Sequence, residues 1–208
     1  MKPGTYARLT LAVLLLTSVT YAGEREKEFG TYKAREIRKS DVWLNSKPLT
    51  LKSLRGKVVV IDFWAFDCEP CIQAMPHVVG LYDKYSKDGL VIIGVHTPRA
   101  DYEKSIEGLR EAVTRMGIQY PVVVDDKQKM FRDYLCDLWP SQFVVDRDGI
   151  VRYSHGGVGR YEEMDKIVRE LLARNPDNLD LHAVIGECLM GEGRFDEAAK
   201  ELLGKPAA

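Results

Sequence analysis

The stretch FWAFDCEPCIQAMP, from Phe63 to Pro76, carries most of what this 208-residue sequence predicts about its fold and chemistry. It holds two of the four cysteines, Cys68 and Cys71, with Glu69 and Pro70 between them. Two cysteines at this spacing can bind zinc, close a structural disulfide or exchange disulfides with another protein. The surrounding residues and the rest of the chain bear on which use applies.

The cysteine pair lies between a predicted strand and a predicted helix. VVVIDFWA (58–65) is a continuous β-branched and aromatic run, typical of a strand buried on both faces. A helix is predicted over 69–85, and LVIIGV (90–95) predicts a second buried strand. A strand, a helix and a strand in this order indicate a βαβ unit whose strands are parallel.

The remaining segments continue the α/β pattern. We expect a helix over 102–116, a short strand in 120–126, a helix over 127–135, two strands in 142–154 and a helix over 162–173. The two strands in 142–154 are joined at Asp146–Gly149, where Asp-Gly is a strong hairpin signal. Ahead of the first buried strand, WLNSKPLTLKSLRGK (43–57) predicts a short hairpin or an edge strand.

The N-terminus has the pattern of a secretory signal peptide. Lys2 and Arg8 accompany the apolar core LTLAVLLLTSV, and small residues lead to a cleavage point after Ala22. The apolar core is shorter than the roughly 20 residues that a membrane span needs, although an uncleaved, membrane-tethered form is the alternative. We therefore expect an exported, periplasmic or extracytoplasmic protein, where a close cysteine pair is redox-active or structural more often than zinc-bound.

The chain divides into four parts. They are a signal peptide (1–22), a charged lead-in (23–40), the α/β domain (41–174) and a tail (175–208). LHAVIGECLMGEGRFDEAAKELL in the tail predicts two short amphipathic helices and resembles a single tetratricopeptide repeat. One such unit cannot bury its own apolar face, so the tail either packs on the main domain or docks a partner protein. A formal net charge of −1 gives no indication of a nucleic-acid partner.

The position of the pair favours thiol–disulfide exchange. A helix N-terminus stabilises a thiolate, so Cys68 should be the exposed nucleophile with the lower pKa. Cys71, in the first helical turn, is placed to resolve the mixed disulfide. Pro70 suits a helix start, and the Glu69 carboxylate should disfavour the thiolate and make the pair more reducing.

Asp62 lies inside the otherwise apolar first strand. A buried carboxylate tends to have a raised pKa, which suits a group that takes and returns a proton. We expect Asp62 to accept the proton of Cys71 during resolution. The alternative is an aspartate at the strand edge that faces water.

Two other uses of the cysteines are disfavoured. Zinc needs about four ligands, but Cys136, Cys188 and the four histidines form no second pair, so we expect no metal and no dissociable cofactor. A peroxiredoxin would need a proline and a threonine or serine where Ile61 and Ala65 stand. Cys136 and Cys188 are most simply packing residues.

IDFWAFDCEPC, followed by Pro76 in the helix, resembles the active-site segment of thioredoxin-fold proteins. LRGKVVVIDFW and the α-β insertion after the second strand are similar to the exported TlpA-like (redoxin) branch. PHVVGLYDKYSKDGLVIIGVHTP and LWPSQFVVDRDGIVRYSHGGVGRYEE are most similar to the thioredoxin-like domain of DipZ-type proteins. The resemblance covers 43–173 and implies an α/β thioredoxin fold with the α-β insertion and an N-terminal hairpin, here followed by the helical hairpin of the tail.

The resemblance also implies a site and an activity. It makes Pro140 the cis proline facing the cysteines, with the Trp139 backbone offered to an extended substrate, and we place Trp64 with them as a substrate-binding residue. The implied activity is thiol–disulfide exchange through a Cys68–Cys71 disulfide. Glu69, Asp62 and Asp67 place negative charge near the sulfurs, so we expect the protein to reduce disulfides of exported proteins. An exported reductant would need electrons from a membrane donor. A non-catalytic, client-binding scaffold that uses the same fold and tail is the alternative.

Overall fold

The computed structural model describes residues 32–174. The predicted signal peptide, residues 23–31 of the lead-in, the tail and Cys188 lie outside the described residues. Within 32–174, no helix is both long enough and apolar enough to cross a membrane.

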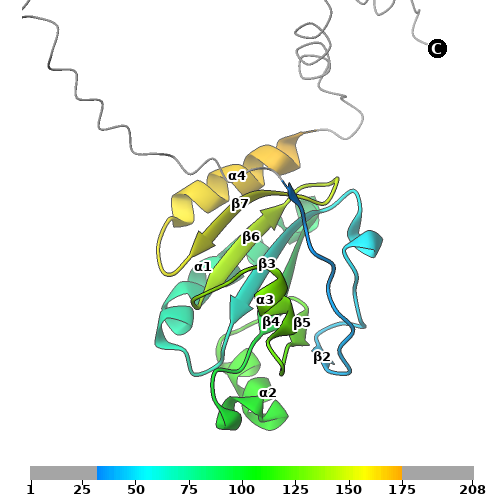
Figure 1. The fold of residues 1–208 in the computed structure, drawn as a ribbon. Coiled ribbons are helices and arrows are strands. Elements are labelled where there is room, and N and C mark those ends of the chain that lie inside the picture. The colour runs from blue at the N-terminus through cyan, green and yellow to red at the C-terminus, as the bar shows by residue number, and fades with distance from the viewer. Residues whose placement is uncertain (1–31, 175–208) are drawn as a thin grey trace, which may run out of the picture. The chain divides into compact units, whose positions relative to one another are not determined.

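The domain is built on one seven-stranded mixed sheet with the order β1-β7-β6-β3-β4-β5-β2 (Figure 1). Its strands are β1 (Tyr32–Lys33), β2 (Trp43–Leu44), β3 (Val58–Trp64), β4 (Leu90–His96), β5 (Val122–Val124), β6 (Ser141–Val145) and β7 (Ile150–Gly156). β4 pairs in parallel with both β3 and β5, and the other pairings are antiparallel. The predicted parallel βαβ unit is therefore confirmed, because α1 connects β3 to β4.

Four α-helices accompany the sheet. They are α1 (Glu69–Tyr85), α2 (Ile106–Arg115), α3 (Lys129–Asp133) and α4 (Tyr161–Ala173), with short 3₁₀ turns η1 (Lys52–Leu54), η2 (Ser86–Asp88) and η3 (Asp101–Lys104). The helix expected over 102–116 is divided, because Ser105 has an extended backbone and caps α2 by accepting a hydrogen bond from the Gly108 amide. The α-β insertion after β4 thus consists of η3, α2 and β5.

The central strands of the sheet are buried on both faces, which explains the uninterrupted apolar run of β3. Alternate β3 residues, Val58, Val60 and Trp64, join one cluster with buried residues of α1, α2 and α4. The intervening residues, Val59, Ile61 and Phe63, join a second cluster with buried residues of α3 and the N-terminal segment. Asp62 has the register of the first set and so lies on the face that α1 covers.

The expected N-terminal hairpin is not formed, and the edge strand is found instead. β2 pairs antiparallel with the distant strand β5 at the sheet edge, and not with a neighbouring segment of the chain as a hairpin would require. Asn45 turns the chain there with a positive φ of 62°, and its side-chain amide donates to the Ile118 and Tyr120 carbonyls, each at 3.0 Å. These bonds to the distant β5 region hold the segment at the edge, which local sequence signals did not indicate.

The hairpin predicted at Asp146–Gly149 is present between β6 and β7. Gly149 has a φ of 74°, in the left-handed region that favours glycine. The Asp146 carboxylate accepts hydrogen bonds from the Asp148 and Ile150 amides, each at 2.9 Å. β6 is thereby held between β3 and β7, with its first residue directly after Pro140.

Candidate active site

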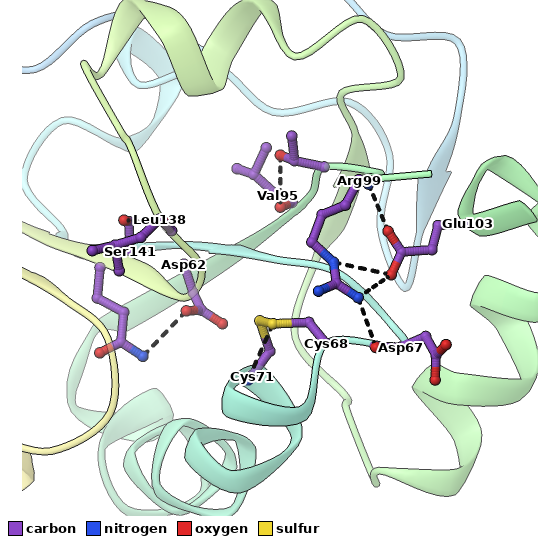
Figure 2. Close-up of a disulfide and its surroundings, with 11 residues drawn as sticks. Asp62, Asp67, Cys68, Cys71, Val95, Arg99, Glu103, Leu138 and Ser141 are labelled. Atoms are coloured by element: carbon purple, nitrogen blue, oxygen red, sulfur yellow. Dashed lines mark hydrogen bonds and ion pairs between the residues drawn. A yellow bond between two sulfur atoms is a disulfide. The ribbon is translucent and has the colours of Figure 1, made fainter. Parts of the chain in front are cut away.

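Cys68 and Cys71 form a disulfide at the start of α1 (Figure 2). Cys68 is the N-cap residue, and its Sγ accepts a hydrogen bond from the Cys71 amide at 3.4 Å. A sulfur at this position faces the free N–H groups and the positive end of the helix dipole, both of which stabilise a thiolate. The helix start therefore suits Cys68 to be the nucleophile once the disulfide is reduced.

The disulfide is buried, contrary to the expectation that Cys68 is exposed. Cys68 and Cys71 are each 1% exposed. Both belong to the apolar cluster under α1, against which the half-buried Trp139 also packs. In the oxidised protein, an attacking thiol therefore reaches the sulfurs only when the side chains around them move.

Asp62 is buried beneath the redox pair. It is 1% exposed, so the alternative of an aspartate facing water is excluded for this structure. Figure 2 shows its carboxylate between the disulfide and β6. Burial raises the pKa of Asp62 to about 7, even though a hydrogen bond from Gln142 opposes this effect. A carboxyl group with this pKa is half-ionised near neutral pH, as proton transfer requires.

The partners of Asp62 come from the two neighbouring strands. Asp62 is opposite Gln142 of β6, whose Nε2 donates to the carboxylate at 3.2 Å, and opposite Gly94 of β4. A Cβ on Gly94 would lie 3.0 Å from Trp64 Nε1 and 3.1 Å from the Tyr120 ring. Gly94 therefore leaves the space that these two buried aromatic side chains occupy.

The peptide bond between Trp139 and Pro140 is cis, as the resemblance implied. The Pro140 carbonyl accepts a hydrogen bond from the Gly157 amide at 2.8 Å. The Trp139 ring stacks on Phe131, with ring centroids 4.1 Å apart. Within residues 32–174, neither the amide nor the carbonyl of Trp139 forms a hydrogen bond with another backbone group.

Trp64 does not lie on a substrate-binding surface, so that prediction is wrong for this structure. Its side chain is 0% exposed and belongs to the core cluster under α1. Its ring packs against His96 with a centroid separation of 5.6 Å. The even register of β3 turns this side chain toward the helices, which cover it completely.

Glu69 and Pro70 occupy the first turn of α1, and both are exposed. Pro70 lies where a helix has no use for an N–H group. Glu69 places a carboxylate beside the helix N-terminus, as predicted. The nearby Asp67 side chain is turned away from the disulfide (Figure 2). Its carboxylate accepts a hydrogen bond from the Tyr102 hydroxyl at 2.8 Å.

Three residues near the redox pair were not expected from the sequence: Arg99, Glu103 and Gln142. The Arg99 guanidinium donates to the Asp67 carbonyl at 2.7 Å and to Glu103 Oε1 at 2.8 Å. Opposite charges four residues apart, just after the end of a buried strand, were a usable signal for the Arg99–Glu103 pair. A polar residue within an apolar strand, directly after the predicted cis proline loop, was the signal for Gln142.

The remaining candidate residues have packing roles in this structure. Cys136 is half-buried beside the second core cluster, and burial raises the pKa of its thiol to about 12. His96 is buried and its ring stacks on Phe66, while the His77 ring stacks on Tyr161. In the part of the chain that the structure describes, no three His, Cys, Asp or Glu side chains are grouped as metal ligands would be.

The comparisons with known proteins agree with this geometry. The model of the AhpC/TSA family matches residues 33–154. Protein DipZ of Mycobacterium bovis is 44% identical over 133 residues, which are 62% of this chain but 19% of that protein. The chain thus spans about a fifth of the length of that relative. Thiol-disulfide oxidoreductase ResA of Bacillus anthracis is 30% identical over 62% of this chain and 71% of its own length.

Solved structures give the same assignment. A thioredoxin-like protein in its oxidised form superposes with a TM-score of 0.63 at 28% identity, covering 70% of this chain and 97% of its own. A thiol-disulfide isomerase from Corynebacterium glutamicum has a TM-score of 0.61 at 24% identity, over 68% and 98% of the two chains, and supports the fold alone. The chain therefore belongs to the AhpC/TSA family, and its described domain is a TlpA-like thioredoxin-fold domain of the thiol–disulfide oxidoreductase type.

Proposed function

We propose that the protein is an exported thiol–disulfide oxidoreductase that reduces disulfides in other extracytoplasmic proteins. The observation that carries the proposal is the Cys68–Cys71 disulfide at the N-cap of α1, on the sheet face where Asp62 is buried. This arrangement brings together a stabilised nucleophile, a resolving thiol and a proton acceptor.

The reaction begins with the reduced protein. The Cys68 thiolate attacks one sulfur of the substrate disulfide, whose S–S bond breaks, and the departing thiolate takes a proton from water. The Cys71 thiol then gives its proton to the Asp62 carboxylate and attacks Cys68 Sγ. The second substrate sulfur leaves as a thiolate and receives a proton, so the substrate gains two electrons and two protons. The protein is left with the disulfide seen in Figure 2.

The substrate approaches along the Trp139 backbone in this proposal. Its free amide and carbonyl support pairing with an extended substrate segment, and its half-buried ring packs on the cluster that contains the cysteines. Deletion of the Trp139 indole would widen this edge. A shift in the preferred substrate of Trp139→Ala, without loss of the Cys68–Cys71 disulfide, tests the assignment.

The direction of electron flow decides whether the protein reduces or oxidises its substrates. Glu69 at the helix start and Asp62 beneath the pair place negative charge near the sulfurs, which disfavours the thiolate and favours a reductant. The reduction potential of the Cys68–Cys71 couple tests this directly. A value near about −270 mV supports a reductant, whereas a value near about −120 mV makes the protein an oxidant.

A trapping variant separates the enzyme from a scaffold. Cys71→Ala stops resolution, so it should accumulate mixed disulfides with the natural substrates on Cys68. Mass spectrometry of the trapped species identifies those substrates. If Cys68→Ala kept the full biological activity of the chain, the client-binding scaffold would replace the enzyme as the explanation.

Export and electron supply belong to the same proposal. The basic start, the apolar core and the small residue Ala22 support cleavage after export, with a tethered form as the other outcome. A reductant in an oxidising compartment needs electrons from a membrane donor. N-terminal sequencing of the protein from the extracytoplasmic fraction tests the cleavage, since a mature chain should begin at Gly23.

A further inference from the structure

The loop that leads from β3 to Cys68 is held by the segment that follows β4. The Thr97 amide donates to the Trp64 carbonyl at 2.8 Å. The Phe66 ring stacks on His96, with ring centroids 5.5 Å apart and planes inclined by 17°. The backbone and an aromatic side chain of the loop are thus both attached to the neighbouring connection.

Asp67, the residue before Cys68, is held at two points. Its carbonyl accepts a hydrogen bond from Arg99 Nη2 at 2.7 Å, and its carboxylate accepts one from the Tyr102 hydroxyl at 2.8 Å. Figure 2 shows the Arg99 guanidinium between Asp67 and Glu103. The bond to the carbonyl acts on the peptide unit that enters the N-cap residue.

Glu103 holds the guanidinium in this place. Its Oε1 accepts from Arg99 Nε at 3.2 Å and from Nη2 at 2.8 Å, and its Oε2 accepts from the Arg99 amide at 2.5 Å. Burial alone would raise the pKa of Glu103, but the hydrogen bonds and charge of Arg99 outweigh it and lower the pKa. The carboxylate is therefore ionised and oriented.

The burial of the acid in this ion pair is unusual for the domain. The Glu103 side chain is 0% exposed, whereas the acid in every other ion pair among residues 32–174 is at least 10% exposed. Such a pair is weak evidence for stability, because the cost of desolvating the Glu103 carboxylate offsets its attraction to Arg99. Its value lies in orienting Arg99 toward the Asp67 carbonyl.

We propose that Arg99, oriented by Glu103, is a positioning residue that keeps Cys68 at the N-terminus of α1 when the disulfide is open. This inference rests on the proposed exchange function. While the disulfide is closed, a covalent bond to Cys71 holds Cys68 in place. After reduction only non-covalent contacts do so, and the Arg99 bond acts on the peptide next to the nucleophile.

The test compares the reduced full-length proteins. Arg99→Gln combined with Glu103→Gln removes one charge of each sign, so the net charge is unchanged and no buried carboxylate is left unpaired. Arg99→Lys keeps the positive charge but loses the planar fork. Arg152→Gln is the control. Arg152 pairs with Asp146, which follows β6, whereas Pro140 and the redox pair lie at the opposite end of that strand. All variants retain the other charged groups near Cys68: Asp62, Asp67 and Glu69.

The measurement is the rate of Cys68 alkylation by iodoacetamide against pH, followed on the Cys68 peptide by mass spectrometry. The double variant should titrate at higher pH and react up to about tenfold more slowly near pH 6, because a Cys68 sulfur that leaves the helix N-terminus loses the amide and helix-dipole stabilisation of its thiolate. Arg99→Lys should shift in the same direction, and Arg152→Gln should match the wild type. The rate at which Cys68 attacks a substrate disulfide should fall in parallel.

Two results would overturn the proposal. In the first, the double variant and Arg99→Lys both show Cys68 alkylation rates within twofold of the wild type at every pH. The other is a lower thermal stability of the double variant with an unchanged Cys68 profile, which would give the pair a purely structural role. Failure of the wild type to exchange disulfides would instead contradict the proposed function, and the alkylation profile would still test Arg99.

Discussion

Gln142 Nε2 donates a hydrogen bond to the Asp62 carboxylate at 3.2 Å, between residues that face each other on the paired strands β6 and β3. Gln142 follows Pro140 by two residues, and Asp62 precedes Cys68 by six. The buried acid is thus tied to the strand that begins at the predicted substrate edge. Several measurable properties depend on this contact.

Asp62→Asn should slow the resolution of mixed disulfides while the first attack by Cys68 proceeds normally. The amide cannot accept the Cys71 proton, and loss of a positioned base typically costs about 10²-fold or more in rate. Stopped-flow mixing with a model disulfide separates the two steps. Asp83→Asn, an exposed position on α1, is the control. Wild-type rates in both steps would remove Asp62 from proton transfer.

The ionisation of Asp62 should lower the stability of the domain as pH rises from about 4 to about 7. The pKa of Asp62 is about 7 in the folded protein and 3.8 in an unperturbed carboxyl group, so between these values the unfolded state has released a proton that the folded state keeps. At about 1.4 kcal/mol per unit, Asp62 alone lowers the free energy of unfolding by up to about 4 kcal/mol, and its effect is level above pH 7. Urea titrations from pH 4 to 8 measure it. The difference between wild type and Asp62→Asn should follow this curve, and a pH-independent difference would contradict it.

Gln142→Met should raise the pKa of Asp62 further. The substitution removes the one hydrogen bond that favours the ionised carboxylate, and a shift of about one unit corresponds to about 1.4 kcal/mol. The pH at which resolution becomes half-maximal should move upward by that amount. Gln73→Met on the exposed face of α1 should leave the profile in place. An unmoved midpoint in Gln142→Met would mean that the contact does not tune Asp62.

Glu69→Gln should make the Cys68–Cys71 couple less reducing. Removing the carboxylate at the helix start favours the Cys68 thiolate, and the thiolate favours the reduced state. Because Glu69 is exposed and its charge is screened, we expect a rise of about 10–20 mV, using 30 mV for about 1.4 kcal/mol. Equilibration with glutathione buffers gives the potential. An equal or lower potential would contradict the role assigned to this carboxylate.

Gly94→Ala should destabilise the domain around the redox site. The new methyl group would lie 3.0 Å from Trp64 Nε1 and 3.1 Å from Tyr120, and overpacking of this kind costs about 1–3 kcal/mol. Gly80→Ala on α1 meets no atom within 4 Å and should be neutral or stabilising, because alanine favours a helix. The stabilities of the two variants can be compared from the midpoints of denaturant unfolding. Equal midpoints would show that the Trp64 pocket can relax.

The local patterns of the sequence were sufficient for most of the fold. The uninterrupted apolar run of β3, the proline and glutamate at the start of α1 and the Asp-Gly turn after β6 each specify their element through neighbouring residues. Trp64 shows where such reasoning fails. It was predicted to bind substrate together with Trp139 and Pro140, but the face on which it lies depends on the packing of three helices against the sheet.

The sequence by itself determined the βαβ unit, the position of Cys68 at a helix start and the presence of an acid within a buried strand. These properties follow from residues close together in the chain. The tertiary structure alone decided that Gln142 meets Asp62, that Arg99 and Glu103 hold the peptide before Cys68, and that the closed disulfide is covered. Each of these depends on strand register and on packing between distant segments, which no local pattern encodes.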